Sequence, residues 1–427
     1  MPKILPFKGV RYNKDVIKDM TAVVAPPYDI IPVRMQGELY AKDPVNVVRL
    51  ILGKINKTDG PDNNRYTRAK DFFLSWLKDN ILIQDKKESF YIYSQKYKKG
   101  NKYIDQIGFI GLMGVEESGD NKVMPHENTL MAPKVDRLSL IREVRANLSP
   151  IFVLYDDAKH AIVKILKKVS SKNKPLIDIE LQGVRHRMWA LDDERLVKKV
   201  ESLAVKKPLF IADGHHRYEV AKMYSKELDK TDVPQALKDA VKYLMVYFVE
   251  SDEKMLTVLP AHRLVKDPGP LTKEDVLSRL EKYFRIYKAA GIKNLMTKLA
   301  ALSKTHAFGL YFGNNNFYIL KLKSTAASDK SISDKPKEWR RLDVSILHHF
   351  IFRHILNIRD EDDNIEFLKD PEETVRFIDE GKCKIAFFLN PTKVSQVQKI
   401  AKLGEKMPRK ATYFYPKQLS GLVINKH

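Results

Sequence analysis

The densest group of chemically active side chains in this sequence is the run Asp213-Gly214-His215-His216-Arg217. An apolar run precedes these residues and a helical pattern follows them, which predicts a strand, a tight turn and a helix. A helix start has unpaired N–H groups and a partial positive charge, and Gly214 can take a positive φ that lets a ligand approach the backbone. With the guanidinium of Arg217 and two imidazoles added, the run predicts a site for an anionic oxygen, such as that of a phosphate.

Two other interpretations of this run stay open. Asp-Gly before a helix is often ordinary turn chemistry, and adjacent histidines are common. His215 and Glu219 lie one helical turn apart and could share a metal ion, although no further ligand has suitable spacing. Two histidines and an arginine at the positive end of a helix are unfavourable unless an anion offsets them, which favours the phosphate interpretation.

Residues 123–157 contain a second group of charged side chains. The start of this stretch follows neither helical nor strand periodicity, and loops with such a density of charge often carry function. We expect Glu127 and Arg137 to take part in the site, together with His126. The later part, LSLIREVRANL, has the pattern of an amphipathic helix whose arginines face solvent.

Three shorter stretches have a similar composition. The prolines of APPYDIIP, at 25–32, force a rigid extended loop that presents Tyr28 and Asp29. LPAHRL, at 259–264, ends a strand with a histidine and an arginine. MPRKATYFYPK, at 407–417, combines basic with aromatic residues, which suits a nucleotide or single-stranded nucleic acid but is more often a core strand with a charged rim.

Several classes of protein are excluded by motifs that the sequence lacks. It has no GxxxxGK[ST] phosphate loop, no GxGxxG dinucleotide fingerprint, no HExxH metal motif and no GxSxG nucleophile motif. The set of motifs that marks protein kinases is also missing. The single Cys383 excludes a disulfide framework and any zinc or iron–sulfur site that needs several cysteines.

The chain is strongly basic, with 76 Lys and Arg against 54 Asp and Glu and a net charge of +22. Such a surface suits phosphates, nucleotides, acidic metabolites or nucleic acid, although a general excess of lysine explains it equally well. Lysines interrupt the start of the chain where a signal peptide needs an apolar run, and no apolar run reaches the length of a membrane helix. We therefore expect a soluble cytoplasmic protein with no membrane partner.

The elements that must position these residues mix helices with strands, without an internal repeat. Helical spacing over 66–81 predicts an amphipathic helix, and alternation over 89–115 and 307–322 predicts two hairpins. We expect an α+β fold, and the 427 residues predict two or three domains. The expected regions are an N-terminal α+β region over 1–157, a core region with the Asp213 run over 158–323, a polar linker or loop over 324–339 and a C-terminal α/β region over 340–427.

Nine short motifs occur in the order in which a bacterial and archaeal family carries them. They are APPYDII, NVVRL, PHENT, DRLSLIR, LSPIFVLYDD, ADGHHRYE, LPAHRL, AFFLNPT and MPRKATYFYPK. On these motifs, which span nearly the whole chain, the protein resembles the family catalogued as domain of unknown function 1015. Its DGHHR element is similar to the phosphate-binding motif of the ParB and sulfiredoxin superfamily, which includes nucleotide-dependent free serine kinases. The resemblance implies a ParB/sulfiredoxin-like core with a smaller C-terminal α/β region.

The resemblance carries over to individual residues. Gly214 matches the glycine that lets the loop approach a phosphate, and His216 and Arg217 match the pair that grips nucleotide phosphates. His215 stands where sulfiredoxin has its reactive cysteine, so thiol chemistry is excluded. The helix-turn-helix region that follows this domain in ParB has no counterpart in the sequence, which favours a small-molecule phosphotransferase over DNA partitioning.

The residues and the resemblance together predict a nucleotide-binding phosphotransferase that uses ATP or ADP with magnesium. Its acceptor is a small hydroxylated metabolite, and free serine is the acceptor that the resemblance implies. Asp213 and Glu127 are the candidates for the base or the magnesium ligand, with Asp213 as the named metal ligand, and Asp29 is the third candidate for a catalytic acid or base. Nucleotide contacts are expected from the residues Gly214, His215, His216, Arg217, His126 and Arg137.

Two alternative functions stay open. One is a nucleotide-regulated, ParB-like protein that binds nucleic acid, which the net charge and the basic turn around Lys98, Lys99 and Lys102 favour. The other is a metabolite sensor without catalysis. Nucleic acid is the less favoured partner, because the sequence predicts no set of helices that would enter a groove.

Overall fold

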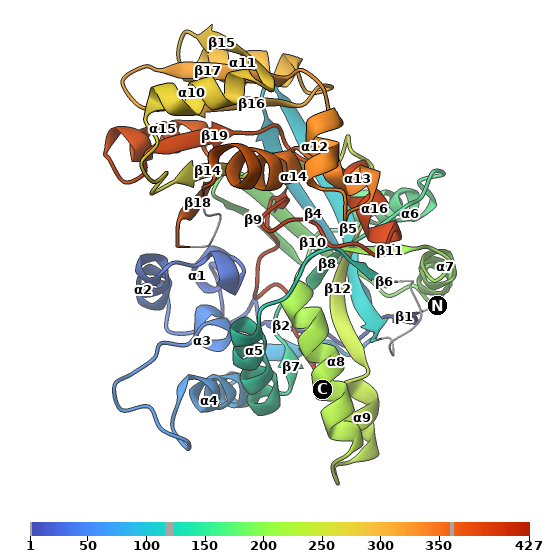
Figure 1. Ribbon diagram of the computed structural model, residues 1–427. Coiled ribbons are helices and arrows are strands. Elements are labelled where there is room, and N and C mark those ends of the chain that lie inside the picture. The colour runs from blue at the N-terminus through green and yellow to red at the C-terminus, as the bar shows by residue number, and fades with distance from the viewer. Residues whose placement is uncertain (1, 116–122, 359–362) are drawn as a thin grey trace. The chain divides into compact units, whose positions relative to one another are not determined.

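The computed structural model describes residues 2–115, 123–358 and 363–427, and Figure 1 shows its helices and strands. The chain divides into two compact units. Unit 1 comprises Met1–Thr257 and Pro416–His427, and unit 2 comprises Val258–Tyr415. Each unit packs helices against a sheet of mostly antiparallel strands, which confirms the α+β fold class.

Unit 1 is built on a nine-stranded sheet. Eight strands lie side by side in the order β6-β11-β8-β12-β5-β4-β10-β9, and β1 pairs with the end of β5. The bounds are β1 Ile4–Leu5, β4 Phe90–Lys99, β5 Lys102–Gly114, β6 Val123–Pro125, β8 Ile151–Tyr155, β9 Ile177–Leu181, β10 Val184–Leu191, β11 Leu209–Asp213 and β12 Tyr243–Glu250. β6 runs parallel to β11 and β8 runs parallel to β12, whereas β11 and β8 are antiparallel.

The neighbouring strands β8 and β12 of this sheet carry almost only apolar side chains. β8 reads IFVLY and β12 reads YLMVYFVE, and seven residues of β12 and all five of β8 are buried. Strands covered on both faces read as continuous apolar runs, because neither face meets water. β4 and β5 form the hairpin expected over 89–115, with Gly100 at a φ of 58° in its turn.

Helices cover both faces of the sheet in unit 1 (Figure 1). They are α1 Met20–Val23, α2 Val33–Lys42, α3 Val48–Ile51, α4 Arg65–Lys78, α5 Met131–Val144, α6 Ala161–Lys172, α7 Glu194–Ala204, α8 His215–Asp229 and α9 Gln235–Ala240, with a 3-10 turn η1 at Tyr28–Ile30. α6 and α7 bury Ile162, Leu166 and Val200 against Phe109 and Phe248 of the strands. Short strand pairs complete the unit, namely β2 Val10–Tyr12 with β3 Leu82–Gln84, and β7 Ala146–Asn147 with β21 Asn425–Lys426.

The helix expected over 66–81 is confirmed as α4. Asn64 caps its start, where its side chain accepts hydrogen bonds from the backbone N–H groups of Tyr66 and Thr67. The Thr67 hydroxyl in turn accepts from the N–H of Asn64, which completes a capping box. The helix ends three residues before the expected end, because Asn80 takes a left-handed φ of 57°.

Unit 2 contains a six-stranded antiparallel sheet in the order β15-β17-β16-β19-β14-β18. Its strands are β14 His262–Val265, β15 Phe284–Ala289, β16 Ala307–Tyr311, β17 Phe317–Leu322, β18 Ile365–Leu368 and β19 Ile385–Phe388. β20 Tyr413–Tyr415 lies outside this sheet. β13 Thr257–Leu259 begins at the last residue of the first segment of unit 1 and ends in unit 2. The helices are α10 Lys273–Glu281, α11 Ile292–Ala301, α12 Ala326–Ser331, α13 Lys337–Arg340, α14 Asp343–Ser345, α15 Pro371–Asp379 and α16 Val394–Lys402, with a π-helix η2 at Ile346–Leu356.

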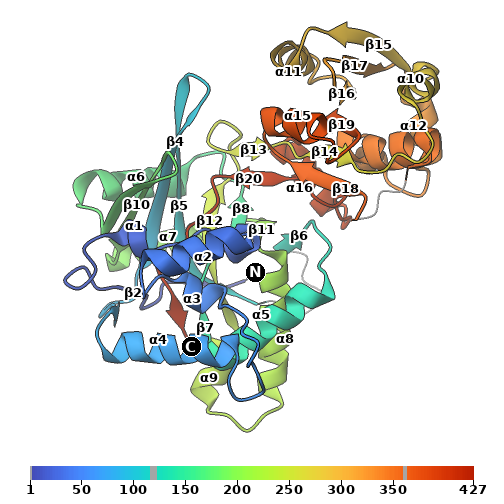
Figure 2. The same cartoon turned by 90° about the vertical axis from the view of Figure 1, so that its left-hand side faces the viewer.

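The helices of unit 2 lie on both faces of its sheet (Figure 2). One apolar core joins α10, η2 and α16 to one face, and a second core joins α11 and α15 to the other. β16 and β17 form the second expected hairpin. Its turn contains Gly313, Asn314 and Asn315, all with positive φ, as a tight turn requires.

Residues 324–339 differ from the expected linker. They contain α12 and most of α13, and Ile332 and Trp339 are buried in the core of unit 2. The Trp339 indole N–H also donates a hydrogen bond to the Lys406 carbonyl at 2.7 Å. The segment has a polar composition because Ile332 and Trp339, the two residues that anchor it in the core, are widely spaced. Its composition therefore did not indicate that it is partly buried.

The compact units also differ from the three expected regions. Residues 158–257 belong with the N-terminal residues, because β11 and β12 share one sheet with β4 and β5. The last residues of the chain return to unit 1, where β21 pairs with β7. As domains, the three expected regions stay a prediction. In the described part of the chain, no helix is long and apolar enough to cross a membrane.

Candidate functional site

The two charged stretches of the sequence meet at one edge of the sheet in unit 1. Ile211 of β11 lies opposite Pro125 of β6, and the two strands run parallel. The residues that follow them, His126 and Glu127 on one side and Asp213 onward on the other, therefore emerge together. β8 is antiparallel to β11, so the loop that precedes Ile151 lies at the same edge.

Gly214 makes the turn from β11 into α8. Its φ is 92°, the positive value expected from the sequence. A Cβ at this position would lie 2.8 Å from Cγ2 of Ile151 and 3.0 Å from an Nη atom of Arg217. Both the backbone conformation and the lack of space therefore require glycine. Among the residues that the structure describes, no side chain caps the start of the 15-residue α8.

His215 connects α8 to the loop after β6. It is 3% exposed, and its Nε2 accepts a hydrogen bond from the backbone N–H of His126 at 3.2 Å. The two imidazoles also meet edge to face, with centroids 4.6 Å apart. Because Nε2 accepts, a neutral His215 carries its proton on Nδ1. That nitrogen lies 3.4 Å from Oε2 of Glu127, so the histidine can hold this carboxylate.

His216 makes a similar connection one residue later. Its Nε2 accepts a hydrogen bond from the backbone N–H of Leu130 at 2.9 Å. Both histidines thus use one ring nitrogen as an acceptor within the protein, where the sequence alone suggested two donors for an anion. Their position at the helix start is therefore explained in part by contacts with the loop at 126–130.

Asp213 is held between two cations. Arg217 Nη2 lies 3.3 Å from one carboxylate oxygen, and Lys417 Nζ bonds to the other. Burial alone would raise the pKa of Asp213, but the charges of Lys417 and Arg217 outweigh it and hold the pKa below its usual value. The carboxylate is therefore ionised at neutral pH, and the three side chains together carry one net positive charge.

Arg217 also anchors the loop before β8. Its Nη1 donates to the Pro150 carbonyl at 2.6 Å and approaches the Ser149 carbonyl at 3.4 Å. Its buried Nε has no hydrogen-bond partner among the described residues. A buried N–H without a partner is costly, so Arg217 keeps one donor unsatisfied in this arrangement.

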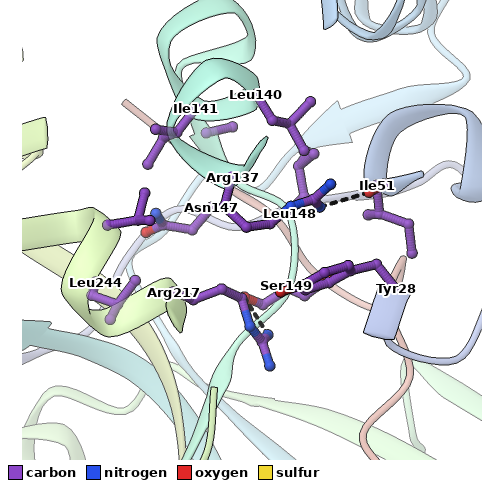
Figure 3. Close-up of a pocket in the computed structure, with 12 residues that line it drawn as sticks. Tyr28, Ile51, Arg137, Leu140, Ile141, Asn147, Leu148, Ser149, Arg217 and Leu244 are labelled. Atoms are coloured by element: carbon purple, nitrogen blue, oxygen red, sulfur yellow. Dashed lines mark hydrogen bonds between the residues drawn. The ribbon is translucent and has the colours of Figure 1, made fainter. Parts of the chain in front are cut away.

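A pocket of about 520 Å³, including its open mouth, adjoins Arg217 in unit 1 (Figure 3). Its walls are mostly apolar and come from α3, α5, the loop after β7, α8 and β12; they include Ile51, Leu140, Ile141, Leu148, Val220 and Leu244. Tyr28, Arg137, Asn147 and Ser149 supply its polar groups. Binding pockets commonly combine apolar walls with a few polar groups in this way.

Arg137 lines this pocket. Its guanidinium stacks 4.0 Å from the ring centroid of Tyr28 and donates to the Ile51 carbonyl at 2.7 Å. Asp136 pairs with it and with Arg65. Burial raises the pKa of Tyr28, and the charges of Arg137 and Arg217 oppose that rise. Figure 3 shows Arg137, Arg217 and Tyr28 lying around the same space.

Asp29 occupies a different position from the other candidates. It is exposed in the turn η1, and its neighbour Tyr28 is the residue of that loop that lines the pocket. Lys417 lies at the candidate site, but the sequence did not predict it as a site residue. It belongs to the basic and aromatic stretch 407–417, and no pattern within that stretch connects it with Asp213.

Magnesium fits Glu127 better than Asp213. In the regions that the structure describes, no three His, Cys, Asp or Glu side chains lie close enough to hold a metal ion by themselves. Magnesium commonly takes one or two carboxylates together with substrate phosphates. Asp213 is already neutralised by Lys417 and Arg217, whereas the Glu127 side chain is 41% exposed and close to the same edge.

The chain belongs to a family of uncharacterised proteins. The sequence model described as "Protein of unknown function (DUF1015)" matches residues 4–345, which confirms the family expected from the motifs. The comparison with curated proteins found no match.

Solved structures resemble the chain only distantly. A conserved hypothetical protein from Pyrococcus furiosus has 12% identity and a TM-score of 0.32, covering 69% of this chain and 87% of that one. A free serine kinase variant in complex with ADP has 12% identity and a TM-score of 0.33, covering 69% and 84%. SbnI from Staphylococcus aureus, with a C-terminal truncation, has 11% identity and a TM-score of 0.35, covering 73% and 85%. Likeness at this level says nothing of the activity of this chain, and the expected kinship with ParB and sulfiredoxin stays a prediction.

Proposed function

We propose that the protein binds the phosphates of a nucleotide at the start of α8 and transfers a phosphoryl group to a small hydroxylated metabolite. The observation that carries this proposal is the excess of positive charge around Asp213. Arg217 and Lys417 outnumber that carboxylate, and they lie at the uncapped, positive end of a long helix. A phosphate placed there meets backbone N–H groups and two fixed cations.

The pocket beside Arg217 supports a nucleotide over a simple phosphate. Its apolar walls can remove a base from water, and the stacked pair of Tyr28 and Arg137 offers a flat, polarisable surface. Arg217 belongs both to the pocket and to the helix start. One ligand could therefore place a base in the pocket and its phosphates near Asp213.

Glu127 is the residue that we assign to the acceptor. In the reaction, the acceptor hydroxyl oxygen forms a bond to the terminal phosphorus, and the bond from that phosphorus to the bridging oxygen of the nucleotide breaks. The hydroxyl proton passes to the Glu127 carboxylate, which is partly exposed and is 3.4 Å from Nδ1 of His215. His215 is a positioning residue in this scheme, because it holds the carboxylate and does not touch the substrate.

Magnesium would be held mainly by the phosphate oxygens and would supply charge neutralisation there, while the Glu127 carboxylate acts as the base. Asp213 has a different role in the proposal. Its two ion pairs orient Lys417 and Arg217 toward the place of the phosphates, and a metal ion would have to displace both cations to reach it. Free serine remains one candidate acceptor among small hydroxy and amino acids.

A nucleotide or metabolite sensor is the second candidate function. It is favoured by the contacts that His215, His216 and Arg217 already make within the protein, because these contacts link the helix start to the loops at 126–130 and 149–150. A sensor needs such coupling but needs no base.

The test is a phosphorus NMR screen of the purified full chain with ATP or ADP, magnesium and a panel of amino acids and hydroxy acids. Transfer predicts a new phosphomonoester resonance with one class of acceptor. Nucleotide binding without transfer to any acceptor would replace the phosphotransferase with the sensor. The absence of both binding and transfer would remove the nucleotide site altogether.

A further inference from the structure

The second half of α8 forms one wall of a groove on unit 1. Lys222, Ser225, Lys226 and Asp229 line this wall, at positions i, i+3, i+4 and i+7, which share one face of a helix. His215, at the helix start, lies seven residues before the first of them, which is about 10 Å along the axis. The groove is therefore separate from the nucleotide site proposed above.

The opposite wall is the end of the central sheet, where β5 finishes beside the starts of β1 and β12 (Figure 1). Lys3, Lys242 and Tyr243 line this wall. Gly114 donates its N–H to the Lys3 carbonyl at 2.9 Å, and the residue after it donates to the Lys242 carbonyl at 2.8 Å. Sheet hydrogen bonds thus hold both lysine backbones in place, so the groove is formed by rigid elements on both sides.

Among the residues that the structure describes, lysines outnumber carboxylates in this groove. Four lysines line it, against Asp229 as the one acidic residue of that described lining. Lys242 has a carboxylate at 3.3 Å, but Lys3, Lys222 and Lys226 form no ion pair with any residue in the described ranges of the chain. Like charges at i and i+4 repel one another on a helix. An anion in the groove would remove that repulsion.

We propose that this groove binds single-stranded nucleic acid. Lysine contacts to phosphates supply most of the affinity of proteins that bind nucleic acid without sequence preference, and the chain as a whole carries +22. Tyr243 adds a half-buried aromatic ring in the same groove, on which a base can stack. A base is free to stack in this way only where the strand is unpaired, so the groove favours a single strand.

The test is fluorescence anisotropy of a labelled oligo-dT of about 12 nucleotides with the full chain, over about 50 to 200 mM salt. The triple variant Lys3→Gln, Lys222→Gln, Lys226→Gln should bind at least about tenfold more weakly at about 50 mM salt. Its slope of log K against log salt concentration should become about 2 less steep, because three phosphate contacts are lost. The matched control is Lys164→Gln, Lys167→Gln, Lys168→Gln, which removes the same charge from the exposed face of α6. We expect the control to stay within about twofold of the parent.

Equal weakening by the two triple variants would assign binding to the overall charge and would overturn the groove. Unchanged affinity in the groove variant would also overturn it, provided that its thermal melting matches that of the parent. Tyr243→Leu tests the nature of the ligand, since it should weaken oligo-dT but leave binding of inorganic polyphosphate unchanged. If polyphosphate or a DNA duplex binds the parent as tightly as oligo-dT, the ligand is not a single strand and the assignment fails.

Discussion

Lys417 donates a hydrogen bond to Asp213, a residue 204 positions earlier in the chain. The two side chains are only 10% and 16% exposed, so water screens the pair weakly. Arg217 pairs with the other oxygen of the same carboxylate. The C-terminal segment Pro416–His427 of unit 1 thereby contributes to the start of α8.

Breaking this pair should destabilise unit 1. Lys417→Gln leaves a buried carboxylate with one cation, and we expect the free energy of unfolding to fall by about 3 kcal/mol in urea denaturation. Adding Asp213→Asn should restore part of the loss, because the buried charge disappears. The exposed Lys399→Gln is the control and should change stability by less than about 0.5 kcal/mol. Additive effects of the two site substitutions would contradict the pairing.

Nucleotide binding should depend on Arg217. In the parent, nucleotide at about 100 times its Kd should add about 2.7 kcal/mol to the stability and raise the melting temperature. Arg217→Ala should abolish this shift, because the fixed charge at the helix start is lost. Arg142→Ala, which breaks an exposed ion pair with Glu227 on the same helix, should preserve it. A full shift in Arg217→Ala would show that the nucleotide binds elsewhere.

Gly214 should tolerate no side chain. Gly214→Ala combines a strained positive φ with a Cβ 2.8 Å from Ile151. Backbone strain alone costs about 1 kcal/mol, so we expect the free energy of unfolding to fall by well over that amount. We also expect nucleotide binding to be lost. Gly183→Ala is the matched control, because its φ of 72° is also positive but nothing lies within 4 Å of the added atom. The difference between the two variants in urea denaturation measures the steric part. An equal fall in the free energy of unfolding of both variants would mean that Ile151 moves aside at no cost and that the steric contact does not require glycine.

Glu127 should be needed for transfer and not for binding. Glu127→Gln keeps the shape of the side chain but cannot accept a proton, so the rate should fall by about 10²- to 10⁴-fold in the NMR assay while the melting shift with nucleotide persists. Glu180→Gln, which replaces an exposed carboxylate on β9, is the acidic control and should leave the rate unchanged. If transfer survives in Glu127→Gln, the base is another carboxylate, and Asp29→Asn is the next variant to assay.

Stability should fall as the pH drops below about 6.5, in part through His186. Burial lowers the pKa of this histidine to about 4, so the folded state keeps it neutral while the unfolded chain takes up a proton near its ordinary pKa. Between pH 6.5 and pH 4 the unfolded state therefore binds more protons than the folded state. The neutral His186 ring of the folded state contributes stability that is present above pH 6.5 and is lost toward pH 4. Between pH 7 and pH 5 the loss should be about 2 kcal/mol.

Urea denaturation at the two pH values measures this effect. His186→Gln should flatten the dependence on pH, because the titrating ring is gone, even if the loss of its 2.6 Å contact with the Tyr93 hydroxyl lowers stability at both values. His354→Gln replaces an exposed histidine and should leave the slope as it is. An unchanged slope in His186→Gln would mean that other groups set the pH dependence.

Features that depend on neighbours in the sequence were predicted well. The strand, turn and helix around Gly214, the helix that begins near Tyr66 and the two hairpins all follow from apolar periodicity and from residues that favour turns. Such signals act over a few residues, so they do not require knowledge of the fold. The segment 324–339 shows the limit, because its composition is polar while the burial of Trp339 depends on the rest of unit 2.

By itself, the sequence determined the α+β class and the family, and it singled out the run from Asp213 to Arg217 as a candidate site. Only the tertiary structure decided what surrounds that run. The parallel pairing of β6 with β11 places Glu127 near His215, and the returning C-terminal segment brings Lys417 to Asp213. These neighbours are set by burial and hydrogen bonding across the whole sheet, which act over distances in the sequence that no local pattern records.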